Sequence, residues 1–306
     1  MKTMRILVPA STSNLGPASD AVGLALNLYN EFIVEPSKDY QIKVKKEGDV
    51  VFLSEKDIEK LQNLDNLFLK AYKTTCAYLG KEVPIKLTEI IRIPIGRGLG
   101  SSATAIVGGI LAAQKVLNKK LSLDEFLDIS FKFESHPDNV LPAYLGGLIV
   151  AATDNEISYI KLNFPEDLKI VVVVPEIYLS TEDSRKVLPK QVPLKDAVFN
   201  IQHTALLIAA LKERKYHLLK EAVKDKIHQP YRSKLIPSFW DIIKVAYDEG
   251  ALAAFLSGAG SCMAAICLEN EDKVGKAMCE VFESDGIQAK YLILKADLDG
   301  ARVIEK

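Results

Sequence analysis

Three glycines alternate with other residues in the stretch PIGRGLGSSATAI, which spans positions 94–106: Gly96, Gly98 and Gly100. Glycine takes backbone angles that other residues avoid, and without a Cβ it lets an anion approach the main-chain N–H groups directly. A helix expected from Ser101 to about Leu117 follows at once, so its unpaired N–H groups and positive dipole end add to the attraction. This spacing predicts a loop that binds a polyphosphate.

Two known glycine-rich signatures match this loop poorly. The nucleoside-triphosphatase loop ends in Gly-Lys-Ser/Thr, but here Ser101-Ser102-Ala103 follows the last glycine and no lysine is present. A dinucleotide fingerprint needs G-x-G-x-x-G directly after a strand, whereas these glycines alternate and Pro94 separates them from the strand. A flexible connection before a helix is a further alternative, because glycine-rich turns are common.

A second cluster, FESHPDNVLPAYLGG, brings ionisable and amide side chains together on one turn. Glu134, His136, Asp138 and Asn139 fall within six positions and are interrupted by Pro137. A lone histidine is more often structural, and the Asp-Asn pair could cap the next helix. Beside a phosphate-binding loop, however, this density of polar groups favours a site.

Two other glycine-bearing pieces have the composition of turns. The piece ASTSNLGPASDAVGLALNLYN places Asn14 and Asp20 on either side of Gly16-Pro17, which is also what an ordinary turn with a helix cap contains. The piece FLSGAGSCMAAICL joins two strand-like runs through residues 257–261, a length that suits a tight hairpin. Neither piece indicates a function by itself.

Hydrophobic periodicity predicts the elements that must position these residues. Strands are expected at 5–8, where Pro9 would end the strand, and at 29–35, 40–45, 50–53, 84–93, 146–153, 157–162, 169–174 and 289–294. Helices are expected at 66–79 with Asn66 as its cap, and at 101–117, from 122 onwards, at 194–212, 216–224, 238–249 and 272–283. Arg185 would lie on a short helix and Arg232 in a loop, both by default as solvated surface charges.

Length and composition narrow the class of protein. Single cores usually stop growing near about 250–300 residues, so a chain of 306 residues is expected to form two domains. The formal net charge is −1 and no basic block is present, which argues against a nucleic-acid partner. No apolar run is long enough for a membrane span or a secretory signal, so we expect a cytoplasmic protein without a membrane partner. Four cysteines lack the spacing of a zinc site and are expected to be reduced core thiols: Cys76, Cys262, Cys267 and Cys279.

Taken in order, the glycine-bearing pieces resemble the three motifs of the galacto-, homoserine, mevalonate and phosphomevalonate (GHMP) kinase superfamily. The pieces are PASTSNLGPASDAVGLAL, PIGRGLGSSATA with HPDNVLPAYLGG behind it, and LSGAGSC, and together they span residues 4 to 268. The first piece together with HPDN most resembles the homoserine kinases. The resemblance implies an α+β fold with an ATP-binding N-terminal domain like ribosomal protein S5 domain 2 (residues 1–160) and a ferredoxin-like C-terminal domain (residues 161–306). Many members dimerise, so a homodimer is expected.

The resemblance also implies substrates and site residues. ATP would be the co-substrate, L-homoserine the acceptor in threonine biosynthesis, and Mg²⁺ the metal, held by Ser102 and Glu134. Asn66 would meet the adenine, and Asn14 and Asp20 would be catalytic. The acceptor would be bound by Asn14, Asp20, His136, Asp138, Thr181, Arg185 and Arg232. The ATP phosphates would be wrapped by Pro94, Ile95, Gly96, Arg97, Gly98, Leu99, Gly100, Ser101, Ser102, Ala103 and Thr104.

The chemistry of a homoserine kinase fits these residue types. The planar guanidinium of Arg185 or Arg232 matches a carboxylate, and Asp20 or Asp138 would hold the ammonium. Phosphoryl transfer passes through a loose transition state, so positioning and charge neutralisation can replace a strong base. An asparagine facing the hydroxyl is consistent with this mechanism, and the role of Asp20 as a base is left open.

Two positions depart from the family pattern. Ala18-Ser19 stands where Gly-Phe is usual, and Glu134-Ser135-His136 stands where Glu-Gly-His is frequent. The first departure concerns the packing of the acceptor loop and therefore the identity of the acceptor. The alternatives are a kinase acting on mevalonate or a related alcohol and, from a different class, a catalytically silent nucleotide-binding sensor.

Overall fold

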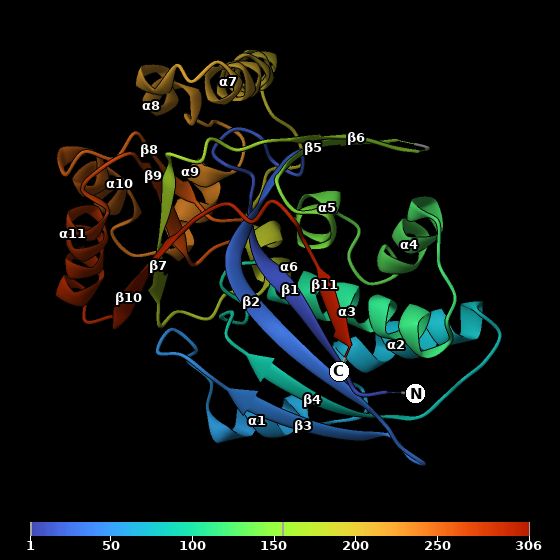
Figure 1. The fold of residues 1–306 in the computed structure, drawn as a ribbon. Coiled ribbons are helices and arrows are strands. Elements are labelled where there is room, and N and C mark those ends of the chain that lie inside the picture. Colours follow the sequence, from blue (N-terminus) through green and yellow to red (C-terminus); the bar gives the residue numbers. More distant parts are fainter. Residues whose placement is uncertain (1, 155, 306) are drawn as a thin grey trace.

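The computed structural model describes residues 2–154 and 156–305 and contains two β-sheets, each with helices packed on it (Figure 1). Within these residues the first sheet has seven strands in the order β11-β1-β2-β4-β3, with β5 on β2 and β6 on β5. The mixed α+β class is confirmed. The strands are β1 (Met4–Ser13), β2 (Val22–Pro36), β3 (Gln41–Lys46), β4 (Ile85–Ile91), β5 (Leu148–Thr153), β6 (Ile157–Leu162) and β11 (Arg302–Glu305).

One face of the first sheet carries the helices that begin near the glycine loop. In α3 the small residues let helices come close: a Cβ on Gly109 would lie 2.4 Å from the backbone oxygen of Phe68 on α2. The predicted caps are confirmed, since Asn66 caps α2 and Ser122 forms a capping box with Glu125 in α4. These helices are α1 (Glu55–Leu61, beside β3), α2 (Leu67–Tyr78), α3 (Ser101–Val116), α4 (Leu123–Ser130) and α5 (Pro137–Leu145).

The second sheet is antiparallel, in the order β10-β7-β9-β8, and both faces of its inner strands β7 and β9 are buried. On β7, Val172 and Val174 pack into a core shared with β2, while Val171 and Val173 face α10 and α11. Burial on both faces explains the continuous apolar run at 169–174. These strands are β7 (Lys169–Pro175), β8 (Ala253–Leu256), β9 (Met263–Cys267) and β10 (Ala289–Leu294), and the helices are α10 (Phe239–Asp248) and α11 (Glu271–Ser284).

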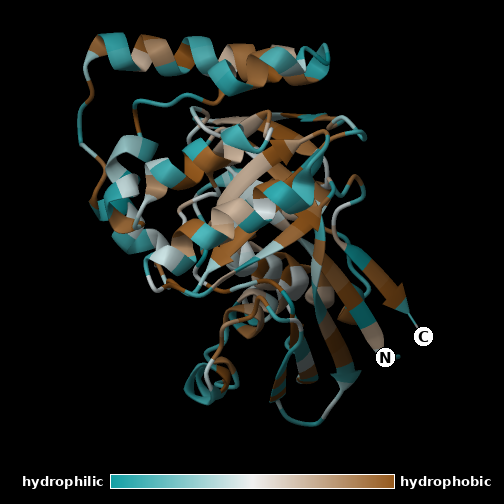
Figure 2. Ribbon diagram, turned by 90° about the vertical axis from the view of Figure 1, so that its left-hand side faces the viewer, coloured by the Kyte–Doolittle hydropathy of each residue, from teal (hydrophilic) through white to brown (hydrophobic). Residues whose placement is uncertain are grey.

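Between β7 and α10 the chain forms a helical arm. In Figure 2 its long helix α7 lies across the top of the molecule and alternates between hydrophilic and hydrophobic residues, whereas the strands are mostly hydrophobic. The arm returns to the body of the protein through α8 and α9. Its elements are α6 (Thr181–Lys186), α7 (Leu194–Lys212), the 3₁₀ turn η1 (Tyr216–Leu218), α8 (Leu219–Ala222), α9 (Gln229–Arg232) and the 3₁₀ turn η2 (Ser233–Leu235).

Three sequence-based expectations about elements were wrong. Pro9 does not end the first strand, because a register shift between Pro9 and Ala10 accommodates a residue that lacks an N–H. Residues 50–53 form no strand and lead instead into α1. Arg232 lies at the end of the short helix α9, not in a loop, and only 2% of its surface is exposed.

The last strand was not predicted at all. In β11, Arg302–Glu305 pairs antiparallel with Met4–Leu7 of β1, so the two ends of the chain meet in the first sheet (Figure 1). The expected boundary after residue 160 falls inside β6, which also belongs to the first sheet. The two sheets therefore do not correspond to two consecutive segments of the chain.

The predictions about the cysteines and about membrane-spanning segments can be compared with this fold. All four cysteines are free and buried, as predicted: Cys76, Cys262, Cys267 and Cys279. Among the described residues, every helix is too short or too polar to cross a lipid bilayer.

Candidate active site

One cavity lies where the three glycine-bearing pieces of the sequence meet. The glycine loop forms one wall, and residues at the end of β1 and just after it form another. The remaining walls come from the turn before α5, from α6 and from the hairpin between β8 and β9. Its lining includes Ser13, Asn14, Asp20, Pro94, Gly96–Ala103, Glu134, His136, Asp138, Asn139, Leu179, Thr181, Arg185, Arg232, Gly258 and Ala259.

The hairpin after β8 holds the other two glycine pieces together. The hydroxyl of Ser257 donates to the backbone oxygen of Gly98 (2.7 Å) and lies 2.8 Å from the hydroxyl of Thr12, from which it can accept. The backbone N–H of Gly258 donates to the oxygen of Ser13 at 3.0 Å. A Cβ on Gly98 would lie only 2.0 Å from the Ser257 oxygen. The close contact therefore requires glycine at position 98.

The glycine loop presents backbone N–H groups to the cavity. Gly96, Gly98 and Gly100 have φ values of +65°, +77° and +67°, in the left-handed region that favours glycine. Gly100 is the N-cap of α3, and no side chain caps that helix. The first N–H groups of α3 therefore remain available for a bound anion, at the positive end of the helix dipole.

Asn14 is fixed at the opposite wall by hydrogen bonds in two directions. Its Nδ2 donates to the backbone oxygen of Gly258 at 2.8 Å, and its Oδ1 accepts from the N–H of Asp20 at 2.9 Å. Asn14, Leu15 and Asp20 all have positive φ values, of +71°, +39° and +58°. Strained backbone of this kind persists where surrounding contacts hold it, and it is frequent at functional sites.

A charged group of three side chains, Asp20, Arg185 and Arg232, completes the lining of the cavity. Two nitrogens of the Arg185 guanidinium contact the two carboxylate oxygens of Asp20 at 2.9 and 3.4 Å. Burial raises the pKa of Asp20, but the Arg185 ion pair outweighs it, so the pKa lies below its ordinary value. The buried Arg232 donates from Nε to the oxygen of Ser184 and from Nη1 to the oxygen of Gly258. The site thus holds fixed charges of both signs.

Two further carboxyl groups are less easily ionised. Burial, with the charge of Asp20 second, raises the pKa of Asp138 to about 6, and the Oδ1 of Asp138 has no hydrogen-bond partner. Burial also raises the pKa of Glu134. An orphaned polar atom of this kind usually indicates an absent water or ligand.

The comparisons with known proteins identify the family. The model of the GHMP kinases N-terminal domain matches residues 66–147, and that of the GHMP kinases C-terminal domain matches residues 207–284. The homoserine kinase of Persephonella marina is 46% identical over 305 residues, which is 99% of each chain. The chain belongs to the GHMP kinase family.

Within this family, several curated relatives that match over nearly the whole chain are homoserine kinases. That of Aquifex aeolicus is 48% identical over 98% of this chain and 99% of its own. The crystal structure of homoserine kinase from Cytophaga hutchinsonii superposes with a TM-score of 0.86 and 28% identity, covering 99% of this chain and 98% of that one. A mevalonate kinase structure with 18% identity and a TM-score of 0.69 shares the fold.

In this GHMP kinase, the cavity gathers all the residues expected to bind the acceptor and most of those expected to bind ATP. Thr104 is different, because it is fully buried and its hydroxyl contacts Asn30 (2.9 Å) and the oxygen of Ser101 (2.7 Å). The guanidinium of Arg97 donates to the backbone oxygens of Pro175 and Ile95. Both side chains therefore make structural contacts. Asn66 and Ile95 line a neighbouring hollow instead.

The structure adds residues that sequence reasoning missed. Asn139 accepts from the hydroxyl of Ser11 (2.9 Å) and donates to that of Ser13 (3.2 Å), directly beside the glycine loop. The HPDN string already pointed to Asn139, but roles were predicted only for its neighbours His136 and Asp138. Ser257 and Gly258 were read as a simple turn, and their long-range contacts leave no mark in the local sequence.

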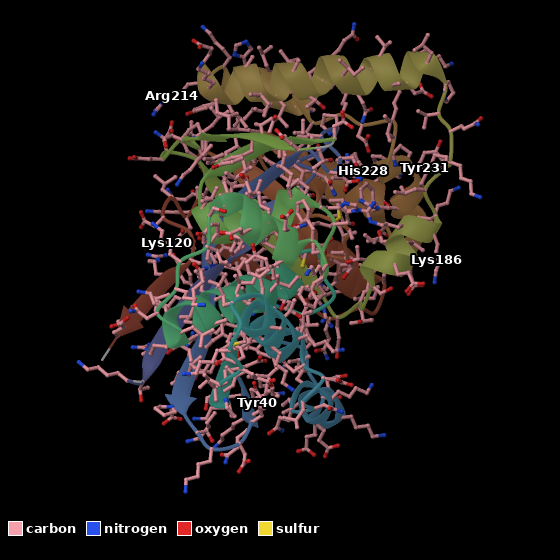
Figure 3. All side chains as sticks on the ribbon, turned by 90° about the vertical axis from the view of Figure 1, so that its right-hand side faces the viewer. Tyr40, Lys120, Lys186, Arg214, His228 and Tyr231 are labelled. Atoms are coloured by element: carbon pink, nitrogen blue, oxygen red, sulfur yellow. The ribbon has the colours of Figure 1, made fainter. Side chains whose placement is uncertain are left out.

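A buried network behind the charged group was also missed. The carboxylate of Asp225 accepts from the N–H groups of residues 227–229 and from the Nδ2 of Asn200 on α7. His228 contacts the backbone oxygen of Gly16 through Nε2 (2.5 Å) and Nη1 of Arg232 through Nδ1 (3.4 Å). Figure 3 shows His228 and the nearby Tyr231 below α7. The network connects Arg232 and the loop that carries Gly16 to the helical arm.

Proposed function

We propose that this chain transfers the γ-phosphoryl group of ATP to the side-chain hydroxyl of L-homoserine, giving O-phospho-L-homoserine. One observation carries the proposal: the backbone cradle at α3, the amide of Asn14 and the charged pair of Asp20 and Arg185 line one cavity. An anion site, a group that can aim a hydroxyl, and charges for a zwitterion are what this reaction needs.

ATP would place its phosphates on the glycine loop and on the first turn of α3. Ser102 and Glu134 both line the cavity and offer a hydroxyl and a carboxylate, which are the hard oxygen donors that Mg²⁺ prefers. Mg²⁺ is usually bound by one or two protein oxygens together with substrate phosphates, so this small donor set fits. The metal would neutralise charge on the phosphates.

The acceptor would lie against the charged group. Arg185 and the buried Arg232 supply guanidinium groups for the carboxylate of homoserine, and Asp20 supplies an anion for the ammonium. His136 and Thr181 line the same cavity and would complete the contacts. Mevalonate carries no ammonium, so the ionised Asp20 favours an amino acid over a mevalonate-type acceptor.

Asn14 would orient the hydroxyl, because its side chain is held by Gly258 and Asp20 and retains one N–H and one lone pair. Asp20 is a weak base, since its ion pair keeps its pKa below the ordinary value. In a loose transition state the hydroxyl proton leaves late, and the transferred phosphoryl group can accept it. The catalytic role of Asp20 would then be electrostatic.

One assay tests the function. ADP release from Mg-ATP would be measured with L-homoserine, mevalonate, shikimate or galactose, each offered singly, alongside ATP binding without an acceptor. We expect release only with homoserine. Release with another alcohol would contradict the substrate, and ATP binding without any release would indicate a silent sensor. A homodimer and a cytoplasmic location remain predictions from the sequence.

A further inference from the structure

A second hollow adjoins the phosphate cradle and shares Ser101 and Ser102 with the active-site cavity. It opens between the starts of α2 and α3 and the strands β2 and β4. Apolar side chains line most of it, with a few polar groups among them: Asn30, Phe32, Leu61, Asn66, Leu67, Glu89, Ile91, Ile95, Ser101, Ser102 and Ala105. Apolar walls with a few placed polar groups are typical of a site for a flat ring. If the phosphates of ATP lie at α3, this hollow is where its base reaches.

Asn66, the residue expected to meet the base, already has other partners. Its Oδ1 accepts from the N–H of Phe68 (2.8 Å) and Leu69 (3.4 Å), which caps α2. Its Nδ2 donates to the backbone oxygen of Leu61 at 2.8 Å. The remaining N–H of its amide donates to the carboxyl group of Glu89. Asn66 is therefore a poor reader of a base edge.

Glu89 is the polar side chain of this hollow that has a buried oxygen without a partner. It lies in β4, between Phe32 of β2 and Val44 of β3, and only 4% of its surface is exposed. Its Oε1 is buried and has no hydrogen-bond partner. A buried polar atom left unpaired in a well-packed sheet is costly unless a ligand or water pairs with it.

The surroundings of Glu89 favour protonation of its carboxyl group. Among the described residues, no other side chain that lines the hollow is ionisable. The charged residues next to it in the sheet lie at alternate positions, so they face the opposite side: Glu31 and Arg92, which pair with each other, and Lys43 and Lys45. Burial, opposed only by a hydrogen bond from Asn66, raises the pKa of Glu89 to about 7.

We propose that Glu89 is the residue that recognises the nucleobase, and that it selects adenine over guanine as a neutral acid. Its O–H donates to a ring nitrogen of adenine, and its carbonyl oxygen accepts from the adjacent 6-amino group. The N–H of Asn66 donates to the carboxyl group of Glu89 while Oε1 has no partner, so the other oxygen stays the acceptor, the proton lies on Oε1, and the order of donor and acceptor is fixed. Guanine presents a carbonyl oxygen at position 6 and an N–H at position 1, which is the opposite order. The proposal rests on the proposed function, because it takes the cradle as the place of the phosphates.

The test compares two variants and a control from the neighbouring strand. Glu89→Gln keeps one donor and one acceptor permanently, and Glu89→Leu keeps neither. Glu35→Gln changes a half-exposed carboxylate on β2 that pairs with Lys86. For each protein, KM would be measured for ATP, GTP, purine riboside triphosphate and L-homoserine. Calorimetry of ADP and GDP binding without an acceptor gives a readout that does not depend on turnover.

We expect the wild type and Glu35→Gln to prefer ATP. Glu89→Leu should raise the KM for ATP by roughly 10- to 100-fold, as for loss of a bidentate base contact, with the KM for homoserine unchanged. Glu89→Gln should keep the preference for ATP. In the wild type, purine riboside triphosphate lacks the amino group but keeps the ring nitrogen, so it should bind more weakly than ATP but less weakly than ATP binds to Glu89→Leu. The comparison of this analogue with ATP in the wild type needs no variant to fold.

Three results would overturn the proposal. They are a wild type that prefers GTP, a Glu89→Leu protein with unchanged discrimination between ADP and GDP, and a wild type that binds purine riboside triphosphate as well as ATP. Nucleotide binding is measured without an acceptor, so a failure here is distinct from failure of homoserine phosphorylation. A protein that binds ADP through Glu89 but phosphorylates no homoserine would contradict only the proposed function.

Discussion

The two walls of the active-site cavity are built in different ways. The nucleotide wall is made of backbone: three glycines with positive φ values and an uncapped helix start present main-chain N–H groups. The acceptor wall is made of side chains from separate elements, with Asp20 after β1, Arg185 on α6 and Arg232 on α9. A backbone site depends on conformation within one short segment, whereas a side-chain site depends on the packing of distant segments.

The largest effect should come from the backbone wall. Gly98→Ala places a Cβ 2.0 Å from the oxygen of Ser257, at a φ of +77°. The loop must then shift away from the hairpin, and we expect kcat to fall by about 1,000-fold, the size seen when preorganised donors are lost. The matched control is Gly286→Ala, where φ is +74° but no atom lies within 4 Å of the new Cβ. Equal activity in the two variants would contradict a backbone cradle.

Asn14 joins the two walls, and its replacement should have the next largest effect on activity. Asn14→Leu removes the hydrogen bonds to Gly258 and Asp20 and the group proposed to aim the hydroxyl. We expect kcat to fall by about 100-fold, as is usual when a reacting group is misplaced. Steady-state kinetics with both substrates would measure it. A protein that retained full turnover would refute the assignment of Asn14.

The acceptor wall should respond in a narrower way. Arg232→Lys keeps the charge but loses the planar fork that fits a carboxylate, so the KM for homoserine should rise by about 10-fold. The KM for ATP should stay the same, because Arg232 is not part of the glycine loop. Arg214→Lys, at a side chain that is 63% exposed, is the control. An equal rise for ATP would indicate a general structural defect.

The smallest effect concerns the pH dependence of stability. Burial raises the pKa of Asp138 to about 6 from an ordinary 3.8, so the folded state holds its proton more tightly than the unfolded state. The contribution of this group to stability is therefore present below about pH 4 and is lost as the pH rises through about 6. Asp138→Asn should be more stable than the wild type at pH 7.5 by about 1–3 kcal/mol, with the difference vanishing near pH 4. Urea unfolding at the two pH values would measure it, and a constant difference would contradict the assignment.

The contrast between the walls also explains what the sequence could predict. The loop from Gly96 to Gly100, the α3 helix behind it and the caps of α2 and α4 were predicted from local patterns, because short segments determine them. Arg185 and Arg232 read as solvated charges until the family resemblance placed them. The ion pair of Arg185 with Asp20 spans 165 positions, and the burial of Arg232 comes from contacts with Ser184 and Gly258, so no local pattern records either.

Other misses have the same physical cause. The strand β11 has only four residues and forms because β1 offers an edge, so its own sequence carries a weak signal. The network of Asp225 and His228 was missed because its members look like ordinary polar residues near a short turn. Glu89 was read as part of a strand. Only the packed structure shows that its carboxyl group faces a hollow and that one of its oxygens, Oε1, has no hydrogen-bond partner.

The pairing of β11 with β1 affects how the protein is made. Translation delivers residues 302–305 long after residues 4–7, yet these segments are hydrogen-bonded neighbours. This edge of β1 therefore stays unpaired while the ribosome adds the residues that separate the two segments. A nascent chain stalled before residue 302 would carry the glycine loop and the hairpin but would lack its outermost strand.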